Sequence, residues 1–336
     1  MKKFFTTLFS LTLFTASIFA APDAESDKII TSKLTEVTDV LIDVNADNTQ
    51  LLLVTPDAYI GKFIPSIPMH FSAGIALSAT FLDSDLLIEP MNEALNEISS
   101  QLYDAFNANV NLDFDIPAKL PVPTAAARLR LGGFFAPFDA GFFGITTFPG
   151  LVDNLEYEDL KAGLNYTAFG ADFRYCVLEE GILLPGISVG GGYIFTKESM
   201  SFSGEKNFTF EQSGNNYKAT INSDIDLDVT QHNIFAEVQA SKKILIFVPY
   251  IGVRYNILMT EEKIDWSYNT TNDTGTGNIE RHDKVTEKND FNIDSGIPHI
   301  YGGIGFNLGL FQLACNLQWN PKNNYVSAGI NFDFKK

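Results

Sequence analysis

The chain has 336 residues, of which 45% are hydrophobic and 19% are charged. Its 41 acidic residues outnumber its 23 basic ones, and the formal net charge of −18 argues against a nucleic-acid partner. Cys176 and Cys315 are too few for a disulfide scaffold, and neither has a His or Cys companion at a metal-ligand spacing. We therefore expect no disulfide, no metal site and no cofactor.

Residues 1–20 have the features of a cleaved secretory signal peptide. Lys2 and Lys3 precede an apolar stretch that ends at Ala20, a suitable residue for a cleavage site. The alternative is an uncleaved membrane helix. No later stretch approaches the ~18 consecutive apolar residues of a spanning helix. If the exported chain enters a membrane, it must do so as a β-barrel.

The N-terminal segment, residues 21–62, allows two interpretations. Ile30, Leu34 and Val37 recur at helical spacing, and an apolar run follows at 51–54. We expect a plug in the barrel lumen or a periplasmic cap. The alternative is an extra pair of wall strands, which would give twelve strands instead of ten.

An amphipathic helix is predicted over residues 86–106. Pro90 suits a first helical turn, and Glu89 and Glu93 complement the positive end of the helix. Its apolar stripe consists of Met91, Leu95, Ile98, Leu102 and Phe106. Because a helix cannot belong to a barrel wall, it must lie in a long loop, either as a constriction or cap at the mouth or packed on the rim.

The remainder of the chain, residues 63–336, is dominated by segments in which apolar and polar or small residues alternate. Alternation with a period of two is typical of strands with one apolar face. Ten such segments, most of about ten residues, suit strands that cross a bilayer at a tilt. They are 71–79, 125–135, 138–142, 169–177, 187–195, 217–238, 247–259, 300–308, 311–319 and 326–334. We predict an all-β fold, an antiparallel transmembrane barrel.

Two places interrupt the pattern. The apolar set changes parity near 230–233, which predicts a β-bulge or a break. Pro249 suggests irregular pairing near a strand start. The connections near 136, 184, 242 and 309 are short and fall on one side. On the other side, 83–124, 149–162, 198–216 and 261–296 are predicted to be long external loops.

A soluble β-sandwich is the rival interpretation, but the proposed outer face has no charged residue within the core strand spans. The inner face instead carries Asp333 and the candidate lumen or selectivity residues, which are Arg128, Arg130, Asp139, Asp172, Arg174, Glu237 and Arg254. The four arginines among them are four of the five in the chain. They could pair with the carboxylates and fill a narrow barrel, or line a wet selectivity zone.

The mature chain, including the terminal strand Ile330–Phe334, resembles bacterial outer-membrane β-barrel proteins. The segments 57–61 and 132–139 are similar to those of spirochaete-type barrels. The resemblance implies a bacterial outer membrane of the Gram-negative type, contact with its lipids, and assembly by the barrel-assembly machinery through the C-terminal strand. Lys335 and Lys336 depart from the pattern, because they displace the usual terminal aromatic residue.

Three functions fit these observations. The first, which we favour, is a porin-like pore or passive transporter for small solutes. The second is a closed barrel that displays surface loops for adhesion or partner binding. The third, a lipid-modifying barrel enzyme, is the least favoured, because none of the four histidines lies in a nucleophile motif and no G-x-S-x-G element occurs. We therefore do not expect an enzyme.

Overall fold

The computed structural model describes residues 70–83, 119–133, 136–147, 155–157, 160–212, 215–273, 278–321 and 325–335. The predicted signal peptide 1–20, the segment 21–62 and the helix 86–106 lie outside these residues. The described part contains eleven strands: β1 (His70–Asp83), β2 (Lys119–Gly132), β3 (Phe138–Thr147), β4 (Leu155–Tyr157), β5 (Leu160–Leu178), β6 (Gly186–Gln212), β7 (Asn215–Ser241), β8 (Phe247–Asp273), β9 (Asn278–Leu308), β10 (Phe311–Asn320) and β11 (Tyr325–Lys335). No helix within the described ranges is long and apolar enough to span a membrane.

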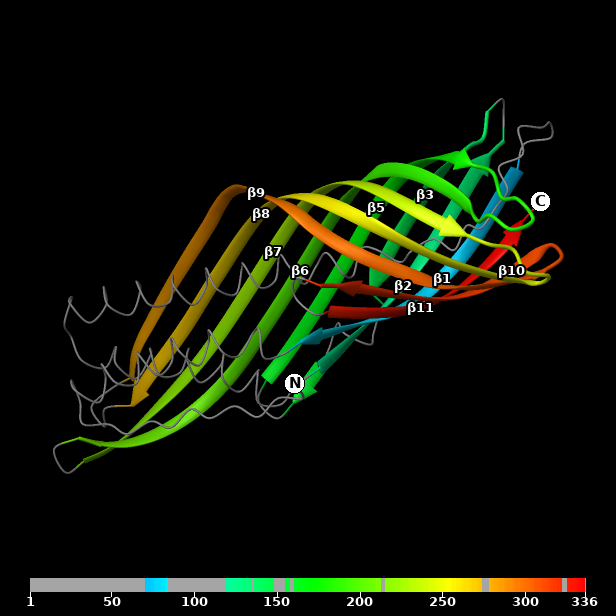
Figure 1. The fold of residues 1–336 in the computed structure, drawn as a ribbon. Helices are drawn as coiled ribbons and strands as arrows, with labels where there is room; N and C mark the ends of the chain where they lie inside the picture. Colours follow the sequence, from blue (N-terminus) through cyan, green and yellow to red (C-terminus); the bar gives the residue numbers. More distant parts are fainter. Residues whose placement is uncertain are drawn as a thin grey trace.

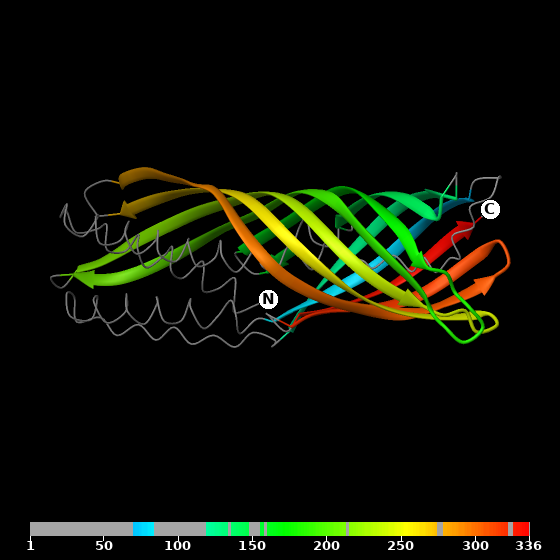
Figure 2. The same cartoon turned by 45° about the horizontal axis from the view of Figure 1, so that its top comes forward.

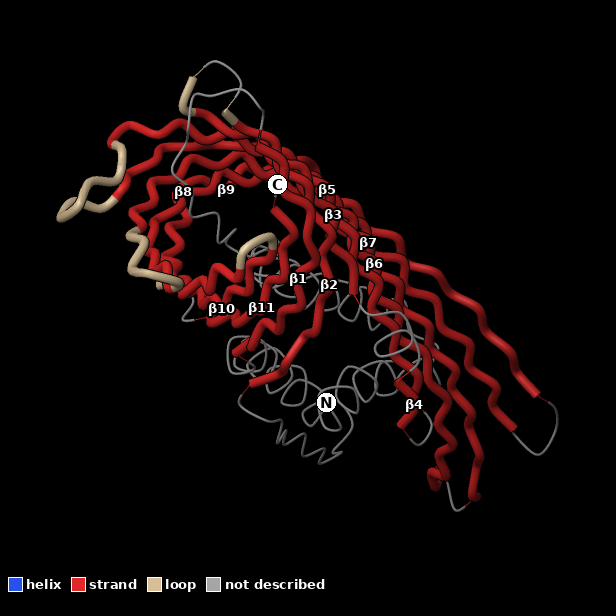
Figure 3. Tube along the Cα trace, turned by 90° about the vertical axis from the view of Figure 1, so that its right-hand side faces the viewer, coloured by secondary structure: helices blue, strands red, loops and turns tan. Residues whose placement is uncertain are grey.

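Ten of the strands close into an antiparallel ring (Figures 1 and 3). Each strand pairs with its neighbours in sequence, except that β4 forms only a short hairpin with β5, and β3 pairs directly with β5. The pairing of β1 with β11 completes the ring. The predicted ten-stranded antiparallel barrel is therefore confirmed.

Strand alternation sorts the side chains onto two faces, as the sequence pattern predicts. On β10 the odd-numbered residues from Phe311 to Trp319 point outward and the even-numbered ones are buried inside. The outer wall is covered with exposed large apolar side chains such as Ile75, Phe169 and Ile251. An apolar surface of this extent is suited to lipid rather than water.

Short turns join the strands at the end of the barrel where the C-terminus lies (Figure 1). Gly309 adopts the left-handed backbone conformation, with φ of 75°, in the tight β9–β10 turn. Leu245 in the β7–β8 turn also has a positive φ, of 58°, which is uncommon for a residue with a branched side chain. Lys242 Nζ donates hydrogen bonds to backbone carbonyls of the β5–β6 turn, including that of Leu184 at 3.1 Å.

At the other end, β6 to β9 continue far beyond their neighbours (Figures 1 and 2). Each has 27 or more residues, whereas β10 has 10. We call the part of β6–β9 beyond the barrel ring the projection. The prediction of long loops at 198–216 and 261–296 is wrong, because β-strand occupies nearly all of both segments. Their polar composition belongs to strands that extend beyond the apolar wall of the ring.

The bulge or break expected near 230–233 is also absent. β7 pairs in unbroken register with both β6 and β8 throughout that stretch. What changes is the polarity of each face: outward residues pass from apolar Ile234 to acidic Asp226, while inward residues pass from polar Asn233 to apolar Val229. The parity flip marks where the apolar outer face of a regular strand ends and a polar one begins.

The irregularity predicted at Pro249 is likewise wrong, since Pro249 pairs with Ile304 in regular register on the outer face. The register shifts in the β8–β9 ladder lie farther along β8, next to Asn256 and between Thr260 and Glu262. The additional residues are on β9. Pro249 lies just beyond the last pair of the β7–β8 ladder, Ser241 with Tyr250, and its carbonyl oxygen still accepts from the Lys242 N–H at 3.1 Å.

Candidate functional site

The structure brings the seven predicted lumen residues to the inner wall and joins all of them in ion pairs. Their side chains come from β2, β3, β5, β7 and β8. Each is at most 11% exposed. Charges buried this deeply need partners, and these residues find them within the wall.

Arg130 and Arg174 share the carboxylate of Asp139. Arg174 donates from Nε and Nη2 to the two oxygens of Asp139, both at 3.1 Å, and Arg130 Nη1 pairs with the same group. Arg130 Nη2 also reaches both oxygens of Asp172, at 2.7 and 2.8 Å. A single network of four charges therefore ties β2, β3 and β5 together.

Arg254 forms a second centre with Glu237, its direct neighbour across the β7–β8 ladder. Arg254 Nε and Nη2 donate to Glu237 Oε2 at 3.0 and 2.6 Å. The guanidinium carbon lies 4.2 Å from the ring centroid of Phe235 and 5.6 Å from that of Tyr301. Tyr301 also donates to Glu237 Oε2 at 3.2 Å, so the carboxylate is bound from two sides.

The partner of Arg128 is Asp333 on the last strand, which the predicted set did not include. Arg128 Nε and Nη2 bind the two carboxylate oxygens of Asp333 at 2.9 and 2.5 Å. Asp333 has inward parity in the sequence pattern, so alternation places it inside the barrel. Alternation does not predict which strands meet when the ring closes, and this closure brings residues 128 and 333 together.

Glycines on intervening strands make these bridges possible. Gly141 on β3 lies in the ladder between Arg130 and Asp172, and the ion pair crosses over it. A Cβ at Gly141 would lie 2.6 Å from Arg130 Nη2 and 2.7 Å from Asp172 Oδ2. Gly74 has the same relation to Arg128 and Asp333. In the sequence, such a crossing ion pair is indicated by a glycine with inward parity opposite a long charged side chain.

The wall formed by β9 and β10 has an uncharged polar lining. Gln312, Asn316, Gln318 and Asn320 on β10 are buried at inward positions. Gln318 Nε2 lies 2.6 Å from His299 Nδ1. The lumen thus has a charged side and an amide side, and neither combines a nucleophile with an activating base among these contacts.

His232, which was expected at the missing bulge, lies on the outer face instead. Its Nδ1 is 2.5 Å from the hydroxyl of Tyr193, and its ring is 5.3 Å from that of Phe195. These residues sit where the outer face changes from apolar to polar. Aromatic side chains at that level are typical of the interfacial girdle of a membrane barrel.

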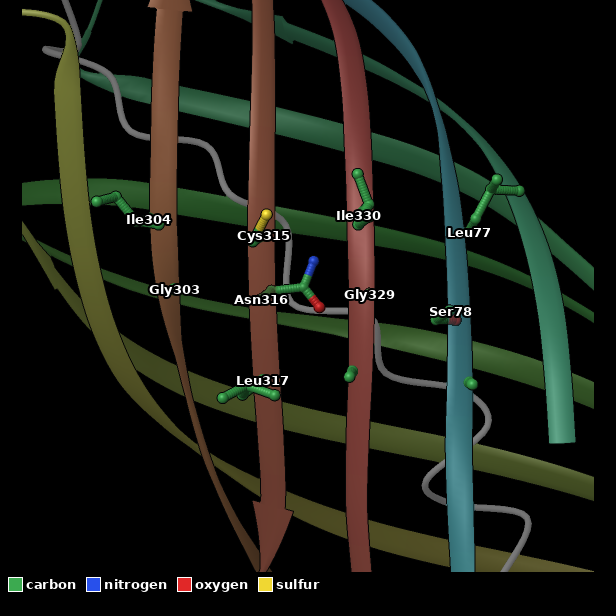
Figure 4. Close-up of a pocket in the computed structure, with 11 residues that line it drawn as sticks. Leu77, Ser78, Gly303, Ile304, Cys315, Asn316, Leu317, Gly329 and Ile330 are labelled. Atoms are coloured by element: carbon green, nitrogen blue, oxygen red, sulfur yellow. The ribbon is translucent and has the colours of Figure 1, made fainter. Parts of the chain in front are cut away.

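A shallow apolar hollow lies on the outer wall over β9, β10, β11 and β1. Figure 4 shows Ile304, Cys315, Ile330 and Leu77 side by side on these four strands. The thiol of Cys315 is exposed on this outer face, whereas Cys176 is buried inside. The hollow faces away from the lumen, so it cannot belong to a path through the barrel.

The outer face of the projection is acidic. Asp224 and Asp226 of β7 are exposed, and Asp226 is paired in the ladder with Asp265 of β8. Lys263 Nζ donates a hydrogen bond to Asp265, and this bond, with further attraction from the neighbouring aspartates, raises the pKa of Lys263. The predicted constriction residues of helix 86–106 lie outside the described residues, so their position relative to these groups stays a prediction.

Comparison with known proteins gives one family match and several weak structural likenesses. A family model described as Lsa36-like matches residues 70–334, the span of the barrel ring. No curated protein matches the chain. Solved structures with similar folds include the translocator domain of the autotransporter NalP from Neisseria meningitidis, with 7% identity, a TM-score of 0.33, and coverage of 90% of this chain and 99% of that one. The transport unit of the autotransporter AIDA-I from Escherichia coli has 9% identity, a TM-score of 0.29, and coverage of 87% and 97%. The TodX monoaromatic hydrocarbon channel has 7% identity, a TM-score of 0.24, and coverage of 80% and 89%.

Proposed function

The chain belongs to the Lsa36-like family, and we propose that it is an outer-membrane β-barrel with a closed lumen. Its function is to hold the projection above the membrane for adhesion or partner binding. This differs from the pore that we favoured on the sequence. The observation that carries it is the pairing of the lumen charges, because a barrel filled by mutually bonded side chains leaves little room for solute.

The charge balance of the ion-paired set supports the same conclusion. Four arginines face four carboxylates, those of Asp139, Asp172, Glu237 and Asp333, so this set has no net charge with which to select ions. A pore that selects ions typically presents a ring of charges of one sign to water. Here the charges are buried against each other and tie strands together.

Three parts of the proposal concern location and class. We propose that residues 1–20 are a cleaved export signal and that the apolar outer wall lies in a bacterial outer membrane. On the segments 57–61 and 132–139, we also propose that the barrel is of the spirochaete type. Folding in the membrane would then depend on the barrel-assembly machinery and on the last strand, and outer-membrane lipids would surround the wall.

A pore or passive transporter for small solutes remains the second candidate, and one observation favours it. The buried side chains of His299, Gln312 and Gln318 have polar atoms without a hydrogen-bond partner among the described residues. Such atoms are usually satisfied by water, which would have to enter the lumen. A hydrated path on the amide side is the form that this pore would take.

Ion conductance across a planar bilayer distinguishes the two candidates. For the full chain refolded in lipid, we expect no discrete current steps, and we expect Arg174→Ala and Arg254→Ala to lower the resistance to denaturant. Steps in the unmodified protein whose selectivity changes in these variants would refute the closed lumen. Activity against ester substrates in the same preparation would instead favour the lipid-modifying enzyme.

Partner binding by the projection is tested with vesicles that carry the refolded protein. We expect the vesicles to be retained on surfaces coated with basic proteins, because the outer face is acidic. Replacing Asp224, Asp226 and Asp228 with Asn should reduce retention. Glu179→Gln with Glu180→Gln, at the opposite end of the barrel, is the matched control. Equal loss in both variants would show that net charge, and not the projection, mediates retention.

A further inference from the structure

The turn between β5 and β6 carries the two most exposed large apolar side chains of the described residues. Ile182 is 96% exposed and Leu183 is 90% exposed, and Leu184 follows at 60%. We call these three residues the apolar tip. Turns that face water are usually built from small and polar residues, and three consecutive exposed apolar side chains are unusual unless they serve a function. The apolar tip therefore indicates contact with something other than water.

The backbone of this turn is held by Lys242, which lies in the neighbouring β7–β8 turn. Lys242 Nζ donates to the carbonyl oxygens of Gly181, of Ile182 at 2.9 Å and of Leu184 at 3.1 Å. The Gly181 N–H donates to the Leu184 carbonyl oxygen, also at 3.1 Å. The turn thus has bonded partners for these backbone groups within the protein.

Internal hydrogen bonds of this kind allow a turn to leave water. In lipid, every backbone polar group needs a partner from the protein, whereas water would satisfy the same groups without Lys242. The ammonium group of Lys242 also has a counter-charge, because Glu180 Oε1 lies 3.7 Å from Nζ. Both side chains are partly buried, at 24% and 20% exposed. The charge that holds the turn is therefore paired at its base.

The apolar tip is continuous with the apolar outer wall. Val177 and Leu178, which precede the turn at the end of β5, are 60% and 39% exposed. Val189, on the outer face of β6 just after the turn, is 40% exposed. Seen from the turn end in Figure 3, the β5–β6 turn extends beyond the outline of the ring and away from the lumen. The tip therefore lies on the same side as the surface that faces lipid.

We propose that the apolar tip inserts into the lipid leaflet at the turn end of the barrel, next to the headgroups, and anchors this rim. The inference rests on the membrane location proposed for the wall. A soluble partner or a second copy of the chain would also bury the tip. Lipid is the occupant that accounts for both the continuity with the wall and the internally bonded backbone.

Tryptophan fluorescence in vesicles tests the insertion. Trp266 and Trp319 are the only tryptophans, so replacing both with Phe allows a single reporter to be introduced. In the refolded full chain, we expect the emission of Leu183→Trp to fall severalfold when the acyl chains are brominated near the headgroup. Acrylamide in the water should quench it weakly. Asp224→Trp, exposed on the projection, should show the opposite response to both quenchers.

A reporter on the wall separates this inference from the proposed location. Ile251→Trp should be quenched by the brominated lipid if the wall lies in the membrane. Quenching of Ile251→Trp without quenching of Leu183→Trp would overturn the insertion alone. If neither is quenched, the membrane location fails and the insertion fails with it. Protection of Leu183→Trp from both quenchers would assign the cover to protein and would also overturn the proposal. Ile182→Trp repeats the measurement if Leu183→Trp does not refold.

The role of Lys242 is tested with the same reporter. Lys242→Met frees the carbonyl groups of the turn, so the turn should return to water and Leu183→Trp should become several times more sensitive to acrylamide. Lys243→Met removes the same charge from the next residue and should leave the quenching unchanged. Equal responses in the two variants would contradict the role assigned to Lys242 in the insertion.

Discussion

Replacing Gly141 with Ala should destabilise the barrel more than a methyl group normally does. The new Cβ would lie within 2.6–2.8 Å of atoms of Arg130 and Asp172, so the ion pair that crosses Gly141 must move apart. Overpacking costs about 1–3 kcal/mol, and breaking a buried ion pair costs about 3–5 kcal/mol. Arg130 keeps Asp139, and alanine restricts the unfolded chain by about 0.5–1 kcal/mol. We expect a net loss of about 2–4 kcal/mol.

The matched control is Gly144→Ala on the same strand. Gly144 faces outward, and a Cβ there would meet the ring of Phe169 at 3.5 Å and the carbonyl oxygen of Ala168 at 3.8 Å, both ordinary contacts. We expect this variant to be neutral or more stable by about 0.5 kcal/mol. The assay is reversible denaturant unfolding of both variants in lipid vesicles, followed by loss of the strand signal in circular dichroism. Equal midpoints would refute the role assigned to Gly141.

A third variant, Asp172→Ala, shows whether the loss of stability in Gly141→Ala comes from the side chains that cross Gly141 or from general crowding. With Asp172→Ala, no side chain passes from β5 over Gly141 to Arg130. The cost of Gly141→Ala should therefore be clearly smaller in this background than in the unmodified protein, since coupled residues are not additive. An unchanged cost would mean that the methyl group clashes with backbone, and that the ion pair is incidental.

Asp139→Asn should destabilise the barrel by about 3–5 kcal/mol, and Asp172→Asn by less, because Asp139 pairs with two arginines and Asp172 with one. Denaturant midpoints measure both losses of stability, and the reverse order would contradict the network. Cys315 should react with a lipid-soluble maleimide in vesicles, whereas Cys176 should react only after unfolding, as mass spectrometry of the labelled protein would show. Leu245→Asn should raise the unfolding free energy by up to ~1 kcal/mol, because Asn adopts the left-handed conformation more readily. A loss of stability in that variant would indicate that the exposed Leu245 side chain contributes by contacting lipid.

Alternation in the sequence was sufficient to predict an antiparallel barrel of ten strands and the face of each residue within the barrel ring. The reason is that lipid outside and packed polar groups inside impose opposite chemistry on successive positions. The seven lumen residues were found in this way. Their pairing was not, since Arg128 and Asp333 are brought together only by ring closure, and Arg130 reaches Asp172 only over a glycine.

The full extent of the projection was not predicted, because the rule that identified the wall assumes a fixed solvent on each side. In the proposed outer membrane, water replaces lipid around the projection, so Asp224 and Asp226 can occupy outward positions equivalent to that of Ile234. By that rule, the same strand is interpreted as a loop or as a bulged strand. A stretch in which both faces change polarity together, with alternation intact, is better interpreted as a strand that crosses the membrane boundary.

The change of polarity along β7 also limits how deeply the barrel can insert into a bilayer. A slide inward by two residues would move Asp228 toward the hydrocarbon by about 7 Å, and a charge there costs up to ~2–4 kcal/mol. A slide outward would lift Ile234 into water. In the membrane that we propose, the change of polarity on β7 therefore fixes the height at which the acidic face of the projection stands above the lipid.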